Sequence, residues 1–353
     1  MIVLEFVIAL GTIIFLHELG HFVVGRSLNI EIEEFGFGYP PRLAKLFTWK
    51  GTDITINLIP FGAFVRFKGE DDPKVTGSLA SANKWARLAI LMGGPVMNLL
   101  IGILLFSIVF SSMGLPVADI VEIQEVVTTA PADTAGILAG DIIQAIYGEK
   151  IDSMEEVGTI IYQHLGEEIP LVVKRGNQTT TIQVTPRTEW PEEQGPIGIV
   201  MTNPIEPISF FQAVPLASNM AIEQGKQLFV MPLMLLRGEI QPSQARVLSP
   251  KGVYDIYAHV RQEEQAIASD TKTTLINTAW FFGIISIALG FSNLLPIPAL
   301  DGGRILFLLP EIFLNKRVPA KFESVVHLIG FSTLIILMFY VFMQDFINPV
   351  VLP

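Results

Sequence analysis

The stretch IVLEFVIALGTIIFLHELGHFVV, residues 2–24, is apolar over most of its length and carries His17, Glu18 and His21 near its end. A helix needs about 20 residues to cross the hydrocarbon core of a bilayer, and residues i and i+4 share one of its faces. His17 and His21 can therefore bind one Zn²⁺ while Glu18 activates a water molecule, as in other HExxH sites. Ionisable side chains at membrane depth are costly, so they favour a functional site over two histidines that merely form hydrogen bonds in a core.

The composition indicates a membrane protein with large polar insertions. Half of the 353 residues are hydrophobic and the mean hydropathy is +0.51. Four stretches reach the length needed to cross a membrane, and they are residues 2–24, 86–114, 276–297 and 325–348. The first lacks the basic start and the Ala-x-Ala exit of a cleaved signal peptide, so we expect it to be retained. The chain has no cysteine, so a metal site must use histidine and carboxylate ligands.

Charge differs sharply between the loops. Residues 25–85 carry eight Lys or Arg and residues 303–323 carry four, whereas residues 115–275 carry ten Lys or Arg against 21 Asp or Glu. Short loops rich in Lys and Arg stay in the cytoplasm. We therefore expect the two basic loops to be cytoplasmic, the acidic loop to be extracytoplasmic and HELGH to lie near the cytoplasmic side.

A third metal ligand is predicted in the segment NLLPIPALDGG, residues 293–303. Two prolines interrupt the helix there, two glycines permit a tight turn, and Asp301 is the only acidic residue between Asp270 and Glu311. Irregular backbone next to an apolar span is tolerated where it is buried in protein or lines a wet cavity. The alternative is a Pro/Gly loop in which Asp301 is a solvated helix cap.

HELGH, Gly93-Gly94-Pro95-Val96-Met97-Asn98 and NLLPIPALDGG, in this order, resemble the site-2 protease family of intramembrane zinc metalloproteases. The bacterial RseP-type (regulator of sigma-E protease) members are the nearest in pattern. The resemblance implies one Zn²⁺ per chain, ligated by His17, His21 and Asp301, with Glu18 as the catalytic base. It also implies that Asn293 hydrogen-bonds the substrate or the oxyanion. Gly93 and Gly94 are expected to let the second span pack closely on the catalytic helix.

Residues 52–68, TDITINLIPFGAFVRFK, alternate in polarity on both sides of Pro60 and Gly62 and so predict a β-hairpin. The resemblance implies a membrane-associated hairpin that engages the substrate. A hairpin edge can pair with an extended peptide by strand addition. We assign substrate contacts to Asn57, Gly62, Ala63 and Val65. The alternative is a hairpin that only packs on the helical bundle.

Residues 118–203 predict a compact mixed β/α domain, because short apolar runs alternate there with Gly and Asp. Its stretch AGILAGDIIQAIYG, residues 135–148, resembles a PDZ domain of the bacterial protease type. The expected role is gating, that is, exclusion of bulky ectodomains until another protease has trimmed the substrate; a structural lid without a ligand is the alternative. Residues 204–275 predict amphipathic helices or a linker, and the loop Leu248–Val253 receives no role.

The predicted fold is a polytopic α-helical membrane protein with about four transmembrane helices, a membrane-associated β-hairpin and an inserted mixed β/α PDZ domain. Helices 1–2 with the hairpin occupy residues 1–117, and helices 3–4 occupy residues 276–353. His164 and His259 are interpreted as ordinary surface or core residues, and His327 as an interfacial polar residue near the start of the fourth span.

The predicted function is a zinc-dependent endopeptidase of a bacterial plasma membrane. Its expected substrates are single-span membrane proteins, such as anti-sigma factors, or remnant signal peptides. We expect the lipid bilayer as a partner and no nucleic acid. A catalytically silent scaffold that recruits partners through the PDZ domain is one alternative, and a membrane metalloprotease that cuts soluble loops is another.

Overall fold

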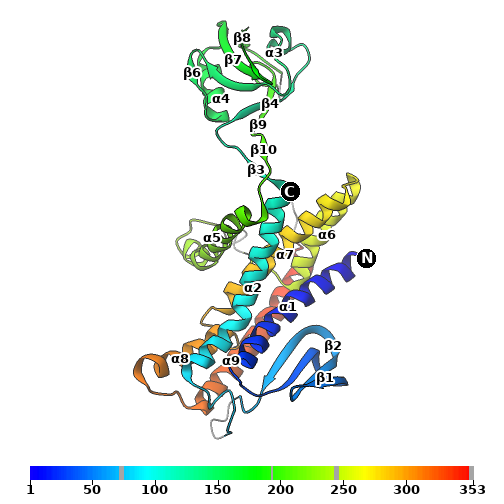
Figure 1. Cartoon of the computed structure of the whole chain (residues 1–353), viewed down its shortest axis with the longest axis vertical. Coiled ribbons are helices and arrows are strands. Elements are labelled where there is room, and N and C mark those ends of the chain that lie inside the picture. The colour runs from blue at the N-terminus through cyan, green and yellow to red at the C-terminus, as the bar shows by residue number, and fades with distance from the viewer. Residues whose placement is uncertain (71–74, 192–193, 242–245, 350–353) are drawn as a thin grey trace. The chain divides into compact units, whose positions relative to one another are not determined.

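The computed structural model describes residues 1–70, 75–191, 194–241 and 246–349 of the chain, and these fall into two compact units (Figure 1). One unit consists of residues 1–109 together with 210–353, and the other of residues 110–209. The second unit is therefore an insertion between two halves of the first. Each unit has its own core.

The first unit is mainly helical and contains four helices long and apolar enough to span a membrane. These four are α1 (Ile2–Ser27), α2 (Lys84–Met113), α7 (Thr271–Asn293) and α9 (Ala320–Ile347). The prediction of four spans is confirmed, and the chain is a multi-pass membrane protein. The third span ends at Asn293, four residues before the predicted end, because the loop with Pro296 and Pro298 cannot continue the helix. The described part of this unit also contains three shorter or less apolar helices, namely α5 (Phe210–Leu236), α6 (Pro250–Ala266) and α8 (Asp301–Leu314).

Glycines allow the spans to pack with their backbones close together. A Cβ atom on Gly20 of α1 would clash with the backbone carbonyl of Gly93 in α2. A Cβ on Gly102 of α2 would clash with the Ile287 side chain of α7, and one on Gly290 would lie 2.8 Å from Leu99 Cδ2. Small residues have this role in membranes because the lipid supplies no hydrophobic force between helices. The close packing expected at the second span is thus present.

Strands β1 (Ile32–Trp49) and β2 (Thr52–Phe67) form an antiparallel pair that contacts α1. Residues 34–37 pair with another segment on each of their two sides. They pair with residues 63–66 on one side and with residues 53–56 on the other. Residues 53–56 pair in turn with residues 44–48. The predicted hairpin within residues 52–68 is therefore wrong in its pairing. Residues 34–37 separate its two arms, and the tight turn lies at Lys50 and Gly51.

A buried carboxylate ties this sheet together. Glu34 is only 2% exposed, and it accepts hydrogen bonds from Thr55 (2.8 Å) and from Arg42 (2.9 Å) and forms an ion pair with Arg66. Burial alone would raise the pKa of Glu34, but the bonds from Arg42 and Thr55 and the charge of Arg66 outweigh that effect and lower it. Because its partners come from both strands, Glu34 fixes the irregular register of the pair.

The sequence assigned no role to the loop Leu248–Val253. In the structure this loop forms hydrogen bonds that hold the start of α6 against the end of α9. Ser249 caps the N-terminus of α6 and donates from its hydroxyl to Asp345 Oδ2 at 2.6 Å. Asp345 is fully buried, and a Cβ on Gly252 would lie 2.6 Å from the same oxygen. Helix α6 also contacts α1 and α7, and α5 packs on α7. Helices thus occupy much of the region that the sequence marked as amphipathic or linker.

The second unit is a small mixed β/α domain, as predicted. Its strands β8, β7, β5, β4 and β9 follow one another across a sheet, with β6 paired to β5. Two helices accompany the sheet, and a two-residue ribbon of β3 and β10 lies where the chain enters and leaves the unit. The bounds are β3 (Leu115–Pro116), β4 (Val121–Val126), α3 (Pro131–Ala135), β5 (Ile142–Ile146), β6 (Glu149–Lys150), α4 (Met154–Gln163), β7 (Ile169–Arg175), β8 (Gln178–Val184), β9 (Ile199–Thr202) and β10 (Ile205–Glu206).

Asp141 explains the Ala-Gly-Asp pattern of this unit. Its carboxylate is fully buried, pairs with Arg175 at 2.7 Å and accepts the Leu138 N–H at 2.9 Å. Burial by itself would raise the pKa of Asp141. The bonds from Arg175 and Leu138 outweigh the effect of burial, so the pKa of Asp141 is lowered. The loop before β5 is thereby closed by an internal ion pair.

Candidate metal centre

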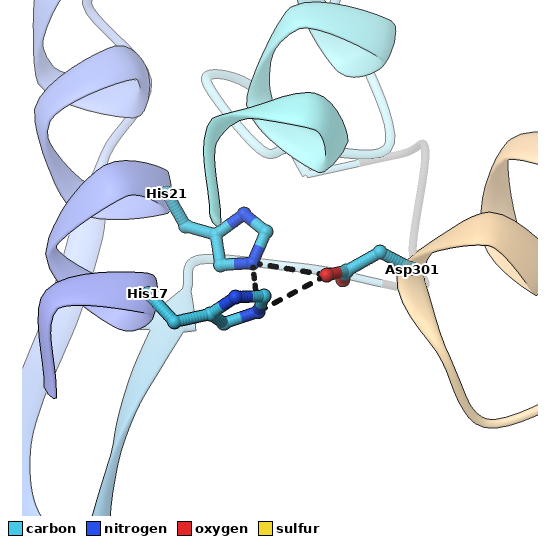
Figure 2. A group of neighbouring side chains, drawn as sticks. All are labelled: His17, His21 and Asp301. Carbon is cyan, nitrogen blue, oxygen red and sulfur yellow. Dashed lines mark hydrogen bonds and ion pairs between the residues drawn. The ribbon is translucent and has the colours of Figure 1, made fainter. Parts of the chain in front are cut away.

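His17, His21 and Asp301 meet at one point although 280 residues of chain separate the second from the third (Figure 2). His17 and His21 project from one face of α1, and Asp301 is the first residue of α8. Asp301 Oδ2 lies 3.2 Å from His17 Nε2 and 3.3 Å from His21 Nε2, and the two Nε2 atoms are 3.2 Å apart. The three atoms therefore form a nearly equilateral triangle.

This triangle has the size that a tetrahedral zinc site requires. Zinc bonds to histidine nitrogen and carboxylate oxygen are about 2.0–2.1 Å long, which places tetrahedral ligands about 3.3 Å apart. Both imidazoles are buried, and Asp301 Oδ2 is a buried oxygen without a hydrogen-bond donor among the described residues. Two proton-free imidazole nitrogens and a carboxylate oxygen repel one another unless a cation lies between them. The donor set thus fits Zn²⁺ with three protein ligands.

Neighbouring groups hold both imidazoles in the metal-binding tautomer. His21 Nδ1 lies 2.7 Å from the Ile90 carbonyl oxygen, so Nδ1 donates and Nε2 keeps its lone pair. His17 Nδ1 lies 3.3 Å from the side-chain amide of Asn98. The amide oxygen of Asn98 is buried without a partner among the described atoms, and exchanging its O and N lets that oxygen accept the His17 Nδ1–H. Asn98 therefore orients His17.

Three glycines make room for the site. A Cβ on Gly94 of α2 would come closer than 3.0 Å to the Nε2 atoms of both histidines. Cβ atoms on Gly302 and Gly303 would clash with the carbonyl oxygens of Leu295 and Ile297, which fold back over the first turn of α8. The glycines of the Asp-Gly-Gly sequence are thus needed to bring Asp301 to the histidines.

A cavity of about 400 Å³ opens at the metal-binding atoms. It is lined by most of the predicted site residues, namely His17, Glu18, His21, Ala63, Val65, Asn293 and Asp301. Asn57 and Gly62 are not among its lining residues. They line a neighbouring apolar cavity of about 570 Å³, and Asn57 donates to the Gly38 carbonyl oxygen at 3.2 Å. Asn57 therefore supports the sheet from a place outside the metal cavity.

One edge of the sheet faces this cavity. Among the described residues, strand partners are found for residues 63–66 on one side only, where residues 34–37 lie. On the other side the backbone N–H of Val65 interacts with the Glu18 carboxyl group. Because peptide groups alternate in direction along a strand, those of Ala63 point to the same side as those of Val65. An open strand edge therefore lies beside the metal-binding residues.

Sequence reasoning missed four residues that contribute to the site. Asn98 lies at the end of a segment that was interpreted only as a packing motif, although its amide contacts His17. Ile90 contributes a backbone carbonyl, for which no sequence signal exists. Arg304 and Glu70 form an ion pair at the cavity wall, and nothing in the sequence links residues so far apart.

The sequence model of peptidase family M50 matches residues 5–337. A protein of Clostridium acetobutylicum named as a candidate zinc metalloprotease is 30% identical, with 98% of this chain and 97% of the relative covered. The regulator of sigma-W protease RasP of Bacillus subtilis is 26% identical, and the zinc metalloprotease RasP of Bacillus licheniformis is also 26% identical. Those two alignments cover 97% of this chain, and 97% and 98% of the relatives.

A solved structure also matches part of the chain. It is the PDZ domain of an SdrC-like protein from Listeria monocytogenes, which is 24% identical with a TM-score of 0.21. The match covers 24% of this chain and 87% of that domain.

Gly94→Ala should abolish metal binding, because the added methyl group would occupy the space between the two imidazoles. Purified protein would be loaded with zinc, and the bound zinc measured by atomic absorption. Gly11→Ala is the matched control, since a Cβ at Gly11 of α1 meets no atom within 4 Å. Helix propensity favours alanine over glycine by about 1 kcal/mol in both variants, so a loss of zinc in Gly94→Ala alone would be steric. Equal zinc in the two variants would contradict the proposed position of the metal.

Proposed function

Because this chain belongs to peptidase family M50 and is a zinc metalloprotease of the membrane, we propose that it cleaves transmembrane segments of single-span membrane proteins. The observation that carries the proposal is the cavity in which His17, His21, Asp301 and Glu18 lie beside an open strand edge. The four side chains correspond to the need for hydrolysis. The strand edge corresponds to the need for an extended substrate.

The proposed metal ligands are His17, His21 and Asp301, and a zinc ion bound there would polarise the scissile carbonyl and lower the pKa of water. Glu18 is the proposed general base. It takes a proton from the attacking water and returns it to the leaving amine. Asn293 lines the cavity and donates one amide hydrogen to the Leu289 carbonyl oxygen at 3.0 Å. Its second amide hydrogen can bind the substrate carbonyl as charge develops.

A transmembrane helix does not expose its peptide bonds, because its backbone is hydrogen-bonded internally. The substrate must therefore be unwound before cleavage. We infer that the edge formed by residues 63–66 adds the substrate as a further strand. The interaction of Val65 with Glu18 supports this inference, since a strand held on that edge would lie next to the general base.

The proposed orientation follows from charge. The basic loops 25–85 and 303–323 are placed in the cytoplasm, which puts the active site near the cytoplasmic side of a bacterial plasma membrane and the second unit outside. Anti-sigma factors and remnant signal peptides are the proposed substrates. The name of the Bacillus subtilis relative, a regulator of sigma-W protease, supports the first of these classes.

Glu18→Gln should bind as much zinc as the wild type and lose cleavage, by about 10²–10⁴-fold, because it removes the proton acceptor and leaves the ligands. His17→Ala and Asp301→Ala should lose both zinc and cleavage. Each protein would be mixed with a labelled single-span substrate while bound zinc is quantified in parallel. Activity in Glu18→Gln would refute its role as the base, and full zinc in Asp301→Ala would place the third ligand elsewhere.

The same experiment separates the alternatives. Mass spectrometry of the product ends shows whether the cut falls inside the apolar stretch of the substrate or in a soluble loop. Folded wild-type protein that binds no zinc and cleaves nothing would favour the silent scaffold.

Ala63→Pro should slow cleavage of the single-span substrate without changing bound zinc, since proline removes one outward N–H from the strand edge. Ala63→Ser is the matched control, because it also changes the side chain but keeps the N–H. Steady-state kinetics would be measured for both, and the proline variant should show the larger loss in kcat/KM. Turnover equal to that of Ala63→Ser would support a sheet that only packs on the bundle.

We further propose that the second unit excludes substrates with bulky ectodomains until another protease has trimmed them. Deletion of residues 118–203 leaves the β3 and β10 ribbon to close the gap. The shortened protein should cleave both trimmed and untrimmed substrates, whereas the full chain should cleave only trimmed ones. Unchanged selectivity, with trimmed substrate still cleaved, would indicate a structural lid.

A further inference from the structure

A loop, and not a regular helix or strand, carries the third metal ligand to the histidines. Residues 294–300 connect α7 to Asp301, and Pro296 and Pro298 have no N–H with which to stabilise the loop. Ala299 has a φ of +85°, a left-handed conformation that is unfavourable for a residue other than glycine. A loop of this kind keeps one shape only if neighbouring elements hold it.

Helix α9 supplies that support at two points. His327 Nδ1 accepts a hydrogen bond from the backbone N–H of Ala299 at 2.9 Å. One turn further along the helix, a Cβ on Gly330 would clash with Pro298, so the backbones of helix and loop are in close contact there. The strained residue and the proline before it are thus both held by α9, two and three residues before Asp301.

The environment of His327 indicates a fixed orientation. Its ring lies 5.4 Å from that of Phe307 in α8, centroid to centroid, and its Nε2 is 3.9 Å from Glu323 Oε1. Because Nδ1 accepts the Ala299 N–H, the ring proton is on Nε2. His327 lines a second cavity of about 370 Å³, together with Ala299 and Arg304, and is not among the lining residues of the metal cavity. It therefore does not touch the reacting atoms.

We propose that His327 is a positioning residue for the metal centre. Through the Ala299 N–H it fixes the Pro-Ala-Leu-Asp turn and so the place of the Asp301 carboxylate opposite His17 and His21. This inference rests on the ligand set proposed above. In this proposal the fourth span, α9, supports metal binding, although it carries no metal ligand in the proposed set. What matters chemically is a hydrogen-bond acceptor at the position of Nδ1.

Three variants test the position of that acceptor. Asparagine at 327 places its side-chain oxygen near the place of Nδ1, whereas glutamine places its oxygen near the place of Nε2. His327→Ala and His327→Gln should bind zinc about tenfold more weakly than the wild type, and His327→Asn should retain wild-type affinity. Thr333→Ala, on the exposed surface of the same helix, is the control for changes in α9. The chains are full length and purified in detergent.

Zinc affinity would be measured by competition with a chromophoric chelator, and the ligand geometry by the visible absorption of the Co²⁺-loaded protein. The Ala and Gln variants should show a shifted Co²⁺ spectrum and the Asn variant the wild-type spectrum. If His327→Ala fails to fold, the comparison of Asn with Gln decides alone. Equal affinities for Asn and Gln would overturn the inference, as would wild-type affinity in His327→Ala while Asp301→Ala loses zinc. Zinc retained in Asp301→Ala as well would show instead that the proposed ligand set has failed.

Discussion

Three atoms that are proposed as metal ligands, and that repel one another in the absence of a cation, converge at one point beside a membrane-spanning helix. His17 and His21 Nε2 and Asp301 Oδ2 lie 3.2–3.3 Å apart, and two of them belong to a membrane-spanning helix. Ionisable groups at that depth are costly, so the fold must satisfy each of them. The carbonyl of Ile90, the amide of Asn98 and the loop before α8 all serve this one requirement.

Close backbone packing is the second constraint. Lipid tails are as apolar as leucine, so helices in a bilayer associate through van der Waals contact and hydrogen bonds. Gly20 and Gly93 bring α1 and α2 together, and Gly94 then leaves a space at the two imidazoles. Neighbouring glycines of α2 therefore have separate roles, since Gly93 permits close packing and Gly94 leaves room for a metal. A methyl group at Gly94 would remove that room, although alanine is the better helix former.

The sheet of β1 and β2 adds a polar edge beside an apolar bundle. Its inner segments are fully paired, and Glu34 pairs with arginines from both strands. Residues 63–65 line the cavity, and among the described residues they pair with another strand on one side only. A peptide unwound from a membrane helix needs partners for its N–H and C=O groups, because no water replaces them there. In the proposed mechanism, the open edge beside Glu18 supplies such partners.

Local patterns in the sequence were sufficient to predict the spans and to select His17, His21 and Asp301, which the fold brings together, as proposed metal ligands. A span is recognised by about 20 apolar residues, and two ligands at i and i+4 lie on one helix face whatever the rest of the chain does. Asp301 is the only acid in a long apolar region, so its role depends little on tertiary detail.

By contrast, the pairing within residues 52–68 was predicted wrongly. Its two arms alternate as a hairpin would, and only the folded chain shows that residues 34–37 lie between them. Asn98 and His327 were likewise beyond sequence reasoning, since each acts across a distance of 28 or more residues on a partner chosen by packing. Sequence alone therefore determined which groups are proposed to bind the metal. Tertiary structure decided what orients them, because hydrogen bonds between distant elements leave no periodic signal.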